Sequence, residues 1–167
     1  MSVLRIVVTD SNVLINLMHA RMLPLMGKLA GYEFVVLDEV IAEFGQPTQA
    51  AALKEALDSR YLRGMALSDF SALALYTELS RTMGQGEAAS LAAAATFGWS
   101  IACDEKCVFL HKARQCLGEG RILTTPGIIV LAIRAGLLTL EEADAIKALL
   151  EKKRFKMTFS SFQEVVG

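Results

Sequence analysis

The stretch RIVVTDSNVLINL, residues 5–17, decides the fold and raises the first question about function. Its continuous apolar start, rich in valine and isoleucine, is typical of a strand buried on both faces and predicts a strand over residues 3–9. The run stops at a carboxylate, Asp10, and a helical pattern follows over residues 11–20. Ser11 and Asn12 already offer helix-capping side chains, so capping alone is the weaker explanation for Asp10.

Short apolar runs and helical patterns alternate along the rest of the chain. Further strands are predicted over residues 33–37, 64–67 (at a sheet edge), 100–103 and 121–124. Helices are predicted to begin at Pro24, at Asp38 (to Gly45) and behind Asp104, and to cover residues 48–59, 68–82 (capped by Ser68), 87–97, 126–135 and 140–153. Gly84, Gln85 and Gly86 are predicted to break the chain before the helix at 87–97.

This alternation indicates an α/β fold, a three-layer α/β/α sandwich with a central parallel sheet. The 167 residues are expected to form a single domain, with residues 126–167 as a C-terminal helical extension of that domain. The sequence shows no internal repeat and no low-complexity segment.

The composition argues against several classes of protein. Hydrophobic residues make up 53% of the chain, which excludes disorder, and a net charge of −1 argues against an unspecific binder of polyanions. The odd number of cysteines, three, and the absence of a leader pattern predict a reducing cytoplasm. The longest uncharged stretch, residues 88–103, is too short and too weakly apolar to predict a membrane span.

Acidic residues follow three of the predicted strands. Asp10 and Asp104 come directly after the first strand and the strand at 100–103, and Glu39 and Glu43 lie in the helix after the second strand. The carboxyl ends of parallel strands meet at one sheet edge, where ligands bind. Glu87 joins them if its helix begins at that edge. Converging carboxylates repel each other, and oxygen-only ligands favour Mg²⁺ or Mn²⁺ as the neutralising ion.

Each acid also has an ordinary explanation. Asp104 is a good cap for the helix behind it, the helix dipole favours Glu87 in a first turn, and Glu39 and Glu43 are spaced as on a solvated helix face. Their conjunction after three strands of one parallel sheet favours the functional interpretation.

Four blocks now carry a resemblance to a known family. In order and spacing, they are similar to the PIN domain, a metal-dependent nuclease fold, over roughly residues 1–117: VVTDSNVLINL (7–17), VIAEF (40–44), GQGEAASLAAA (84–94) and IACDEKC (101–107). The later stretch PGIIVLAIRAGLLT (126–139) resembles the C-terminal segment of a prokaryotic PIN-like group described as predicted nucleic-acid-binding proteins. Relatives of that group often show Gly-Thr where this chain has Thr124-Thr125-Pro126, which leaves the role of that loop open.

The resemblance implies that the first strand and the strand at 100–103 are neighbours. It also implies a catalytic quartet that holds one or two Mg²⁺ or Mn²⁺ ions, namely Asp10, Glu43, Glu87 and Asp104. Ser11 or Asn12 would steady Asp10 by hydrogen bonding. Glu39 is the rival of Glu43, and Glu105 stands where many relatives carry a second aspartate.

Basic residues follow the fourth acid of the quartet. Lys106 and Arg114 are candidate contacts for a phosphate backbone, although a solvated helix face is the commoner role for such residues. Cys103, Cys107 and His111 are spaced by four, but no C-x-x-C pair exists, so buried thiols are favoured over zinc.

The function expected from this resemblance is that of an endoribonuclease, which hydrolyses RNA phosphodiester bonds through a metal-activated water. Many small prokaryotic members are the toxin of a toxin–antitoxin pair, so an antitoxin partner and a homodimer are also expected. The alternative is a non-catalytic PIN-like module that binds nucleic acid or protein. A phosphatase with Asp10 as nucleophile is disfavoured, because Asn12 stands where that chemistry usually wants a second aspartate.

Apolar side chains near the C-terminus allow two interpretations. Phe155, Phe159 and Phe162 are expected to clamp a last helix onto the core, in preference to docking a partner. The leucines of residues 137–150 are a possible dimer face.

Overall fold

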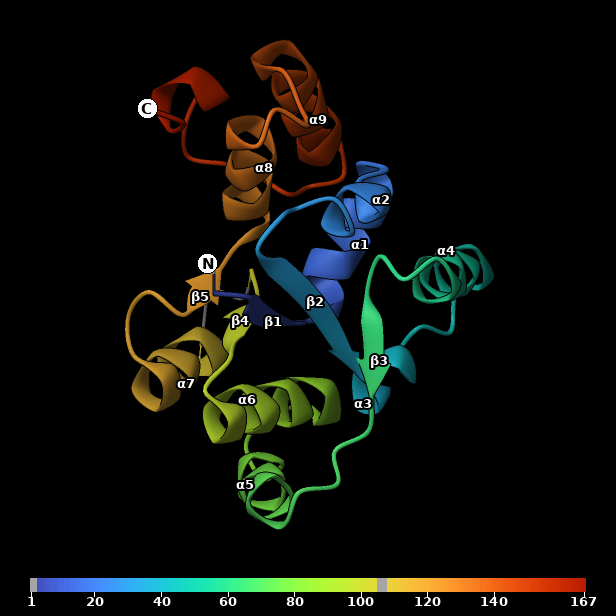
Figure 1. Cartoon of the computed structure of the whole chain (residues 1–167), viewed down its shortest axis with the longest axis vertical. Coiled ribbons are helices and arrows are strands. Elements are labelled where there is room, and N and C mark those ends of the chain that lie inside the picture. Colours follow the sequence, from blue (N-terminus) through green and yellow to red (C-terminus); the bar gives the residue numbers. More distant parts are fainter. Residues whose placement is uncertain (1–2, 105–107) are drawn as a thin grey trace.

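The computed structural model describes residues 3–104 and 108–167 (Figure 1). Within these residues one parallel sheet has the strand order β3-β2-β1-β4-β5. Its strands are β1 (Arg5–Thr9), β2 (Tyr32–Leu37), β3 (Arg63–Met65), β4 (Ser100–Ala102) and β5 (Ile122–Leu123). The helices are α1 (Ser11–His19), α2 (Leu23–Met26), α3 (Asp38–Ile41), α4 (Pro47–Asp58), α5 (Phe70–Leu79), α6 (Gln85–Phe97), α7 (Val108–Leu117), α8 (Thr125–Arg134), α9 (Leu140–Lys152) and the 3₁₀ helix η1 (Phe162–Glu164).

Helices cover both faces of this sheet. On one face α6 packs against β1, β2 and β4, with α5 outside it and α7 beside it. On the other face α1 contacts α2, α4, α8 and α9, which Figure 1 shows across the sheet from α6. The predicted three-layer α/β/α architecture with a parallel central sheet is confirmed.

Strand β1 lies at the centre of the sheet. Val7 and Val8 are fully buried, and Val8 is in register with Val35 of β2 and with Ile101 of β4. The apolar run at the start of the chain is therefore explained by helices on both faces and strands on both sides. The backbone N–H of Asp10 donates to the carbonyl of Ala102 at 3.0 Å, so β1 and β4 are neighbours up to their carboxyl ends.

Helix α6 is buried through its middle turns, which its alanine-rich sequence permits. Small side chains let its backbone approach both the sheet and α5, and the alanines from Ala88 to Ala94 expose no surface. The helix ends at Gly98, whose φ of 71° is the left-handed conformation that glycine adopts without strain. Across the part of the chain that the structure describes, no helix combines the length and apolarity that a membrane crossing requires.

Three predicted helix boundaries are wrong, each for a local reason. Helix α5 is capped by Asp69 and not by Ser68, because an Asp69 carboxylate oxygen accepts from the Ala72 N–H at 3.1 Å. Helix α3 ends at Ile41. From there to Phe44 the backbone forms turns with hydrogen bonds between residues three apart, and not a continued α-helix. Helix α6 begins at Gln85, so the predicted break at 84–86 lies within its first turn.

The C-terminal phenylalanines pack on the core, as the favoured interpretation predicted. Phe162 is fully buried and its ring lies 4.9 Å from that of Phe159, edge to face. The segment forms the short η1 and not a longer helix. It is held by Asp144 of α9, whose carboxylate accepts from the Phe162 N–H at 2.8 Å and from the Ser161 hydroxyl at 2.7 Å.

Arg121, before β5, ties together the ends of two helices. Its guanidinium donates to the carbonyl oxygens of Ala94 (2.9 Å), Trp99 (2.6 Å) and Leu117 (3.4 Å). The positive charge therefore lies at the C-terminal ends of α6 and α7, where helix dipoles favour it.

We expect Arg121→Met to lower the free energy of unfolding by about 2 kcal/mol, because three carbonyls lose a charged donor. Arg121→Lys should recover only part of this loss, because one ammonium cannot reach all three oxygens. Urea denaturation measures the difference, with the exposed Arg81→Met as the control. Equal unfolding midpoints for Arg121→Met and wild type would contradict this role.

The two hydrogen bonds to Asp144 also predict a pH dependence. The Phe162 N–H and then the Ser161 hydroxyl hold the pKa of Asp144 below its ordinary value of 3.8. Below pH 3.8 the unfolded chain binds this proton before the folded chain does, so the stabilisation is full above that pH and is lost as the pH falls further. The difference in unfolding free energy between wild type and Asp144→Asn should therefore shrink below pH 3.8. A difference that stays constant with pH would contradict a stabilising role of the Asp144 charge.

Candidate functional site

The carboxyl edge of the sheet gathers the acidic residues that the sequence singles out. Asp10 directly follows β1, Asp104 lies two residues beyond β4, and Glu39 and Glu43 follow β2. The parallel register of β1 with both β2 and β4 places these strand ends at one edge. The site therefore rests on three adjacent strands at the centre of the sheet.

Asp10 is the most deeply buried of these acids, with 1% of its surface exposed. It occupies the N-cap position of α1, but its side chain makes no capping hydrogen bond to that helix. Helix capping therefore does not account for a carboxylate at this position. The predicted hydrogen bond from Ser11 or Asn12 to Asp10 stays a prediction.

Glu43 is held at the first turn of α6. Its Oε1 accepts from the backbone N–H of Gly86 at 3.1 Å, which brings it beside the turn that carries Glu87. A Cβ on Gly86 would lie 2.2 Å from Oε1 and 2.8 Å from Cδ of Glu43. The Glu43 carboxylate therefore fits in this position only because residue 86 has no side chain. The positive N-terminal end of the α6 dipole also attracts the carboxylate charge.

Asp104 is held by two segments far from it in sequence. Its Oδ1 accepts from the backbone N–H of Thr125 at 2.8 Å, and its Oδ2 accepts from the Thr125 hydroxyl and from Nδ2 of Asn16 at 3.1 Å. Asp104 thus binds the N-terminus of α8 and a side chain of α1. Its predicted role as the cap of α7 stays a prediction, because residues 105–107, which precede that helix, lie outside the described residues.

Sequence reasoning missed Asn16 and Thr125. A signal for Asn16 was present, because a polar side chain stands on the apolar face of α1 between the buried Val13 and Leu17. Thr125 lies in the loop that departs from the pattern of relatives, and nothing local in the sequence links that loop to Asp104.

Glu39, the rival of Glu43, has an unsatisfied oxygen. Its Oε2 is buried and has no hydrogen-bond partner among the described residues. A buried carboxylate oxygen is costly unless a cation, a proton or water meets it. The candidate ligand atoms at this edge are the oxygens of carboxylates and of Asn and Thr side chains. Such oxygen ligands fit a hard divalent cation.

The structure places the segments that carry the predicted quartet in two neighbouring pairs. Strand pairing sets Asp10 and Asp104 on neighbouring strand ends, and the Gly86 hydrogen bond sets Glu43 beside the turn of Glu87. Within residues 3–104 and 108–167, no three acidic, histidine or cysteine side chains form a group that could hold a metal ion. The quartet as a set of metal ligands stays a prediction.

For several other predicted residues the proposed role stays untested. Lys106, Glu105 and Cys107 lie outside the described residues. Arg114 is exposed in the last turn of α7, and its predicted contact with a phosphate backbone stays a prediction. Cys103 is fully buried.

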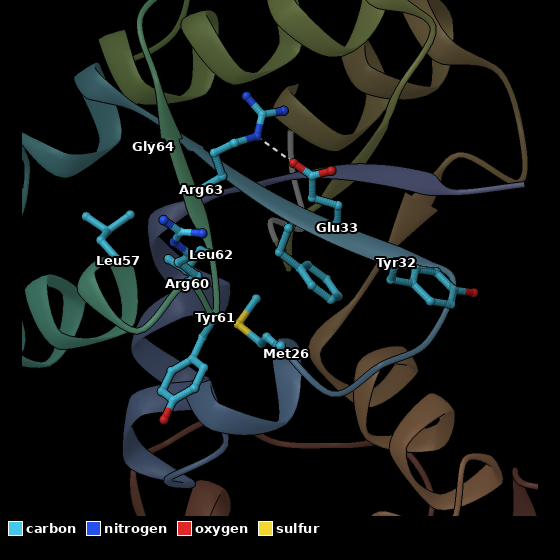
Figure 2. Close-up of a pocket in the computed structure, with 11 residues that line it drawn as sticks. Met26, Tyr32, Glu33, Leu57, Arg60, Tyr61, Leu62, Arg63 and Gly64 are labelled. Atoms are coloured by element: carbon cyan, nitrogen blue, oxygen red, sulfur yellow. Dashed lines mark hydrogen bonds and ion pairs between the residues drawn. The ribbon is translucent and has the colours of Figure 1, made fainter.

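A pocket of about 610 Å³ lies elsewhere on the molecule, at the beginnings of β2 and β3. Figure 2 shows Tyr32, Met26 and Tyr61 around it, and Arg63 paired with Glu33. The beginnings of parallel strands lie at the opposite edge of a sheet from their carboxyl ends. The pocket is therefore separate from the acidic residues, and its own acid is already paired with a base.

Comparison with known proteins gives one match. A family profile described as a PIN domain matches residues 6–166, nearly the whole chain. No curated protein and no solved structure matches significantly.

We expect Gly86→Ala to displace the Glu43 carboxylate without unfolding the protein. The added Cβ meets the far end of a flexible side chain, which moves more cheaply than backbone, so the unfolding free energy should change by less than about 1 kcal/mol. In a crystal structure Glu43 should leave the first turn of α6, and the amide of residue 86 should exchange faster with solvent.

Gly84→Ala is the matched control, because its Cβ would have nothing within 4 Å. If Glu43 keeps its position in Gly86→Ala, a glycine at residue 86 is not needed to make room for the Glu43 carboxylate.

Proposed function

Because the chain belongs to the PIN domain family, a family of nuclease-like modules, we propose that it is a metal-dependent endoribonuclease. The substrate is single-stranded or structured RNA, hydrolysed at a phosphodiester bond. Asp10, Glu43, Glu87 and Asp104 hold one or two Mg²⁺ or Mn²⁺ ions. The observation that carries this proposal is the position of acid-bearing segments at the ends of β1, β2 and β4, on one edge of a parallel sheet.

Each acid has a distinct part in this proposal. Asp10 is buried at the end of a central strand, where its carboxylate would be a metal ligand held in place by the sheet. Glu43 and Asp104 are oriented by backbone N–H groups of Gly86 and Thr125, so little reorganisation is needed when a cation or substrate binds. When bound, the metal neutralises phosphate oxygens and activates water for attack on phosphorus.

The acidic edge needs positive charge from elsewhere to attract RNA. The exposed Arg114 on α7, and Lys106 before that helix, are the proposed contacts to the phosphate backbone. The near-neutral net charge of −1 fits a local contact of this kind better than a broad basic surface.

The second candidate function is a PIN-like module that binds nucleic acid or protein without cleaving it. The near-neutral charge favours it mildly, whereas the acids that follow β1, β2 and β4 oppose it. For binding without cleavage, neither a buried carboxylate at Asp10 nor the absence of a side chain at Gly86 is required.

The proposal extends to organisation and biology. We propose a single domain of residues 1–167, with residues 126–167 as its C-terminal helical extension, and the packing of α8 on α1 and the hydrogen bond from Thr125 to Asp104 support this. We propose a cytoplasmic homodimer that acts as the toxin of a toxin–antitoxin pair. A small open reading frame immediately upstream of the gene would support that role.

Cleavage of labelled single-stranded RNA by the purified full chain tests the chemistry. We expect cleavage with Mn²⁺, none with a chelator, and a loss of about 100-fold or more in Asp10→Asn, because the metal loses a buried ligand. Asp58→Asn, on the exposed face of α4, is the matched control and should retain full activity.

Manganese should also raise the melting temperature of the wild type and of Asp58→Asn, but not that of Asp10→Asn. Cleavage that survives the chelator or Asp10→Asn would contradict the proposal. RNA binding without cleavage by the wild type would favour the non-catalytic module.

A further inference from the structure

Three segments of the chain meet at one carboxylate. Asp104 follows β4, Asn16 lies in α1 and Thr125 is the first residue of α8. Thr125 donates twice to Asp104, through its backbone N–H to Oδ1 and through its hydroxyl to Oδ2. Asn16 Nδ2 donates to the same Oδ2 at 3.1 Å and lies 3.5 Å from the Thr125 hydroxyl oxygen.

Both donor side chains are buried in otherwise apolar surroundings. Thr125 exposes none of its surface and Asn16 exposes 9%, next to the buried Val13 and Ile129 of the same helices. If these two positions served only to pack α1 against α8, two apolar residues would be more stabilising there. A buried polar group costs free energy unless it is paired. The side chains of Asn16 and Thr125 find this pairing in Asp104.

The hydrogen bonds also decide which carboxylate oxygen is accessible to a ligand. A carboxylate oxygen has two lone pairs, and among the described residues Oδ2 receives two donors whereas Oδ1 receives one. We propose that Asn16 and Thr125 are positioning residues, which fix Asp104 so that Oδ1 is the oxygen it offers to a divalent cation. This inference rests on the proposed metal-dependent function of the same edge.

A purely structural role would have a different signature. If Asp104 only capped α8, loss of the Thr125 hydroxyl would lower stability and leave cation affinity unchanged. The neighbouring Thr124 offers a matched comparison, because its hydroxyl caps α8 by accepting from the Gly127 N–H at 3.1 Å and makes no hydrogen bond to Asp104.

The test measures Mn²⁺ affinity by the electron paramagnetic resonance signal of free Mn²⁺, with the full chain and no RNA. Thr125→Val keeps the shape and backbone N–H but loses the hydroxyl, and we expect its Mn²⁺ affinity to fall about 10-fold to 100-fold. Thr125→Ser, which restores the hydroxyl, should recover the affinity to within about 3-fold of wild type. Thr124→Val should melt at a lower temperature with unchanged affinity.

Asn16→Leu gives a second, independent variant with a similar volume, and it decides the matter should Thr125→Val fail to fold by circular dichroism. Wild-type affinity in folded Thr125→Val or Asn16→Leu would overturn the inference, as would an equal loss in Thr124→Val. A wild-type chain that binds no Mn²⁺ at millimolar concentration would overturn the proposed metal-dependent function, and the inference with it, and this result is distinct from the others.

Discussion

The central position of β1 is the constraint on which the site depends. Because β1 pairs in parallel with β2 on one side and β4 on the other, three strand ends are fixed side by side. The hydrogen bond from the Asp10 N–H to Ala102 carries this pairing one residue past the strand. The sheet thus brings segments that are remote in sequence to one edge, and hydrogen bonds from the first turns of α6 and α8 then orient Glu43 and Asp104.

Carboxylates gathered at one edge repel each other, and the fold supplies partial positive charge to hold them. Gly86 at the start of α6 donates to Glu43, and Thr125 at the start of α8 donates to Asp104. In both cases the donor is a first-turn backbone N–H that has no partner within its own helix. The acids satisfy the ends of helices, and the helices orient the acids, so each stabilises the other without a lysine or arginine among these contacts.

The sequence allowed the layers and the strand ends to be predicted, because apolar runs and helical periodicity are local signals. The short extent of α3 and the Asp69 cap were missed, since competing turn and capping residues stand side by side at both places. Asp10, Asp104 and Glu43 were singled out by their position after strands, and Glu87 by its place at the start of a helix and by the family resemblance. Their partners were not, because Asn16 and Asp104 are 88 residues apart and only the folded chain brings them together.

Gly86 shows the same limit from the opposite direction. In the sequence a glycine between Gln85 and Glu87 indicates a break, and the structure places it inside a helix. Its cause is a carboxylate from a segment 43 residues earlier, which occupies the space of a missing side chain. No window of local sequence contains that information.

The contact between Asp104 and Thr125 makes the C-terminal helices thermodynamically part of the acidic edge. Helix α8 packs on α1 and α9, so its docking and the orientation of one carboxylate are a single equilibrium. By reciprocity, a ligand that binds Asp104 only while α8 is docked would raise the free energy of local unfolding of residues 125–167. Such a ligand and a molecule bound to α8 or α9 would change each other's affinity by the same factor. A molecule bound to α8 or α9, on the face of the sheet that does not carry α6, would therefore affect the acidic edge without contacting the acids.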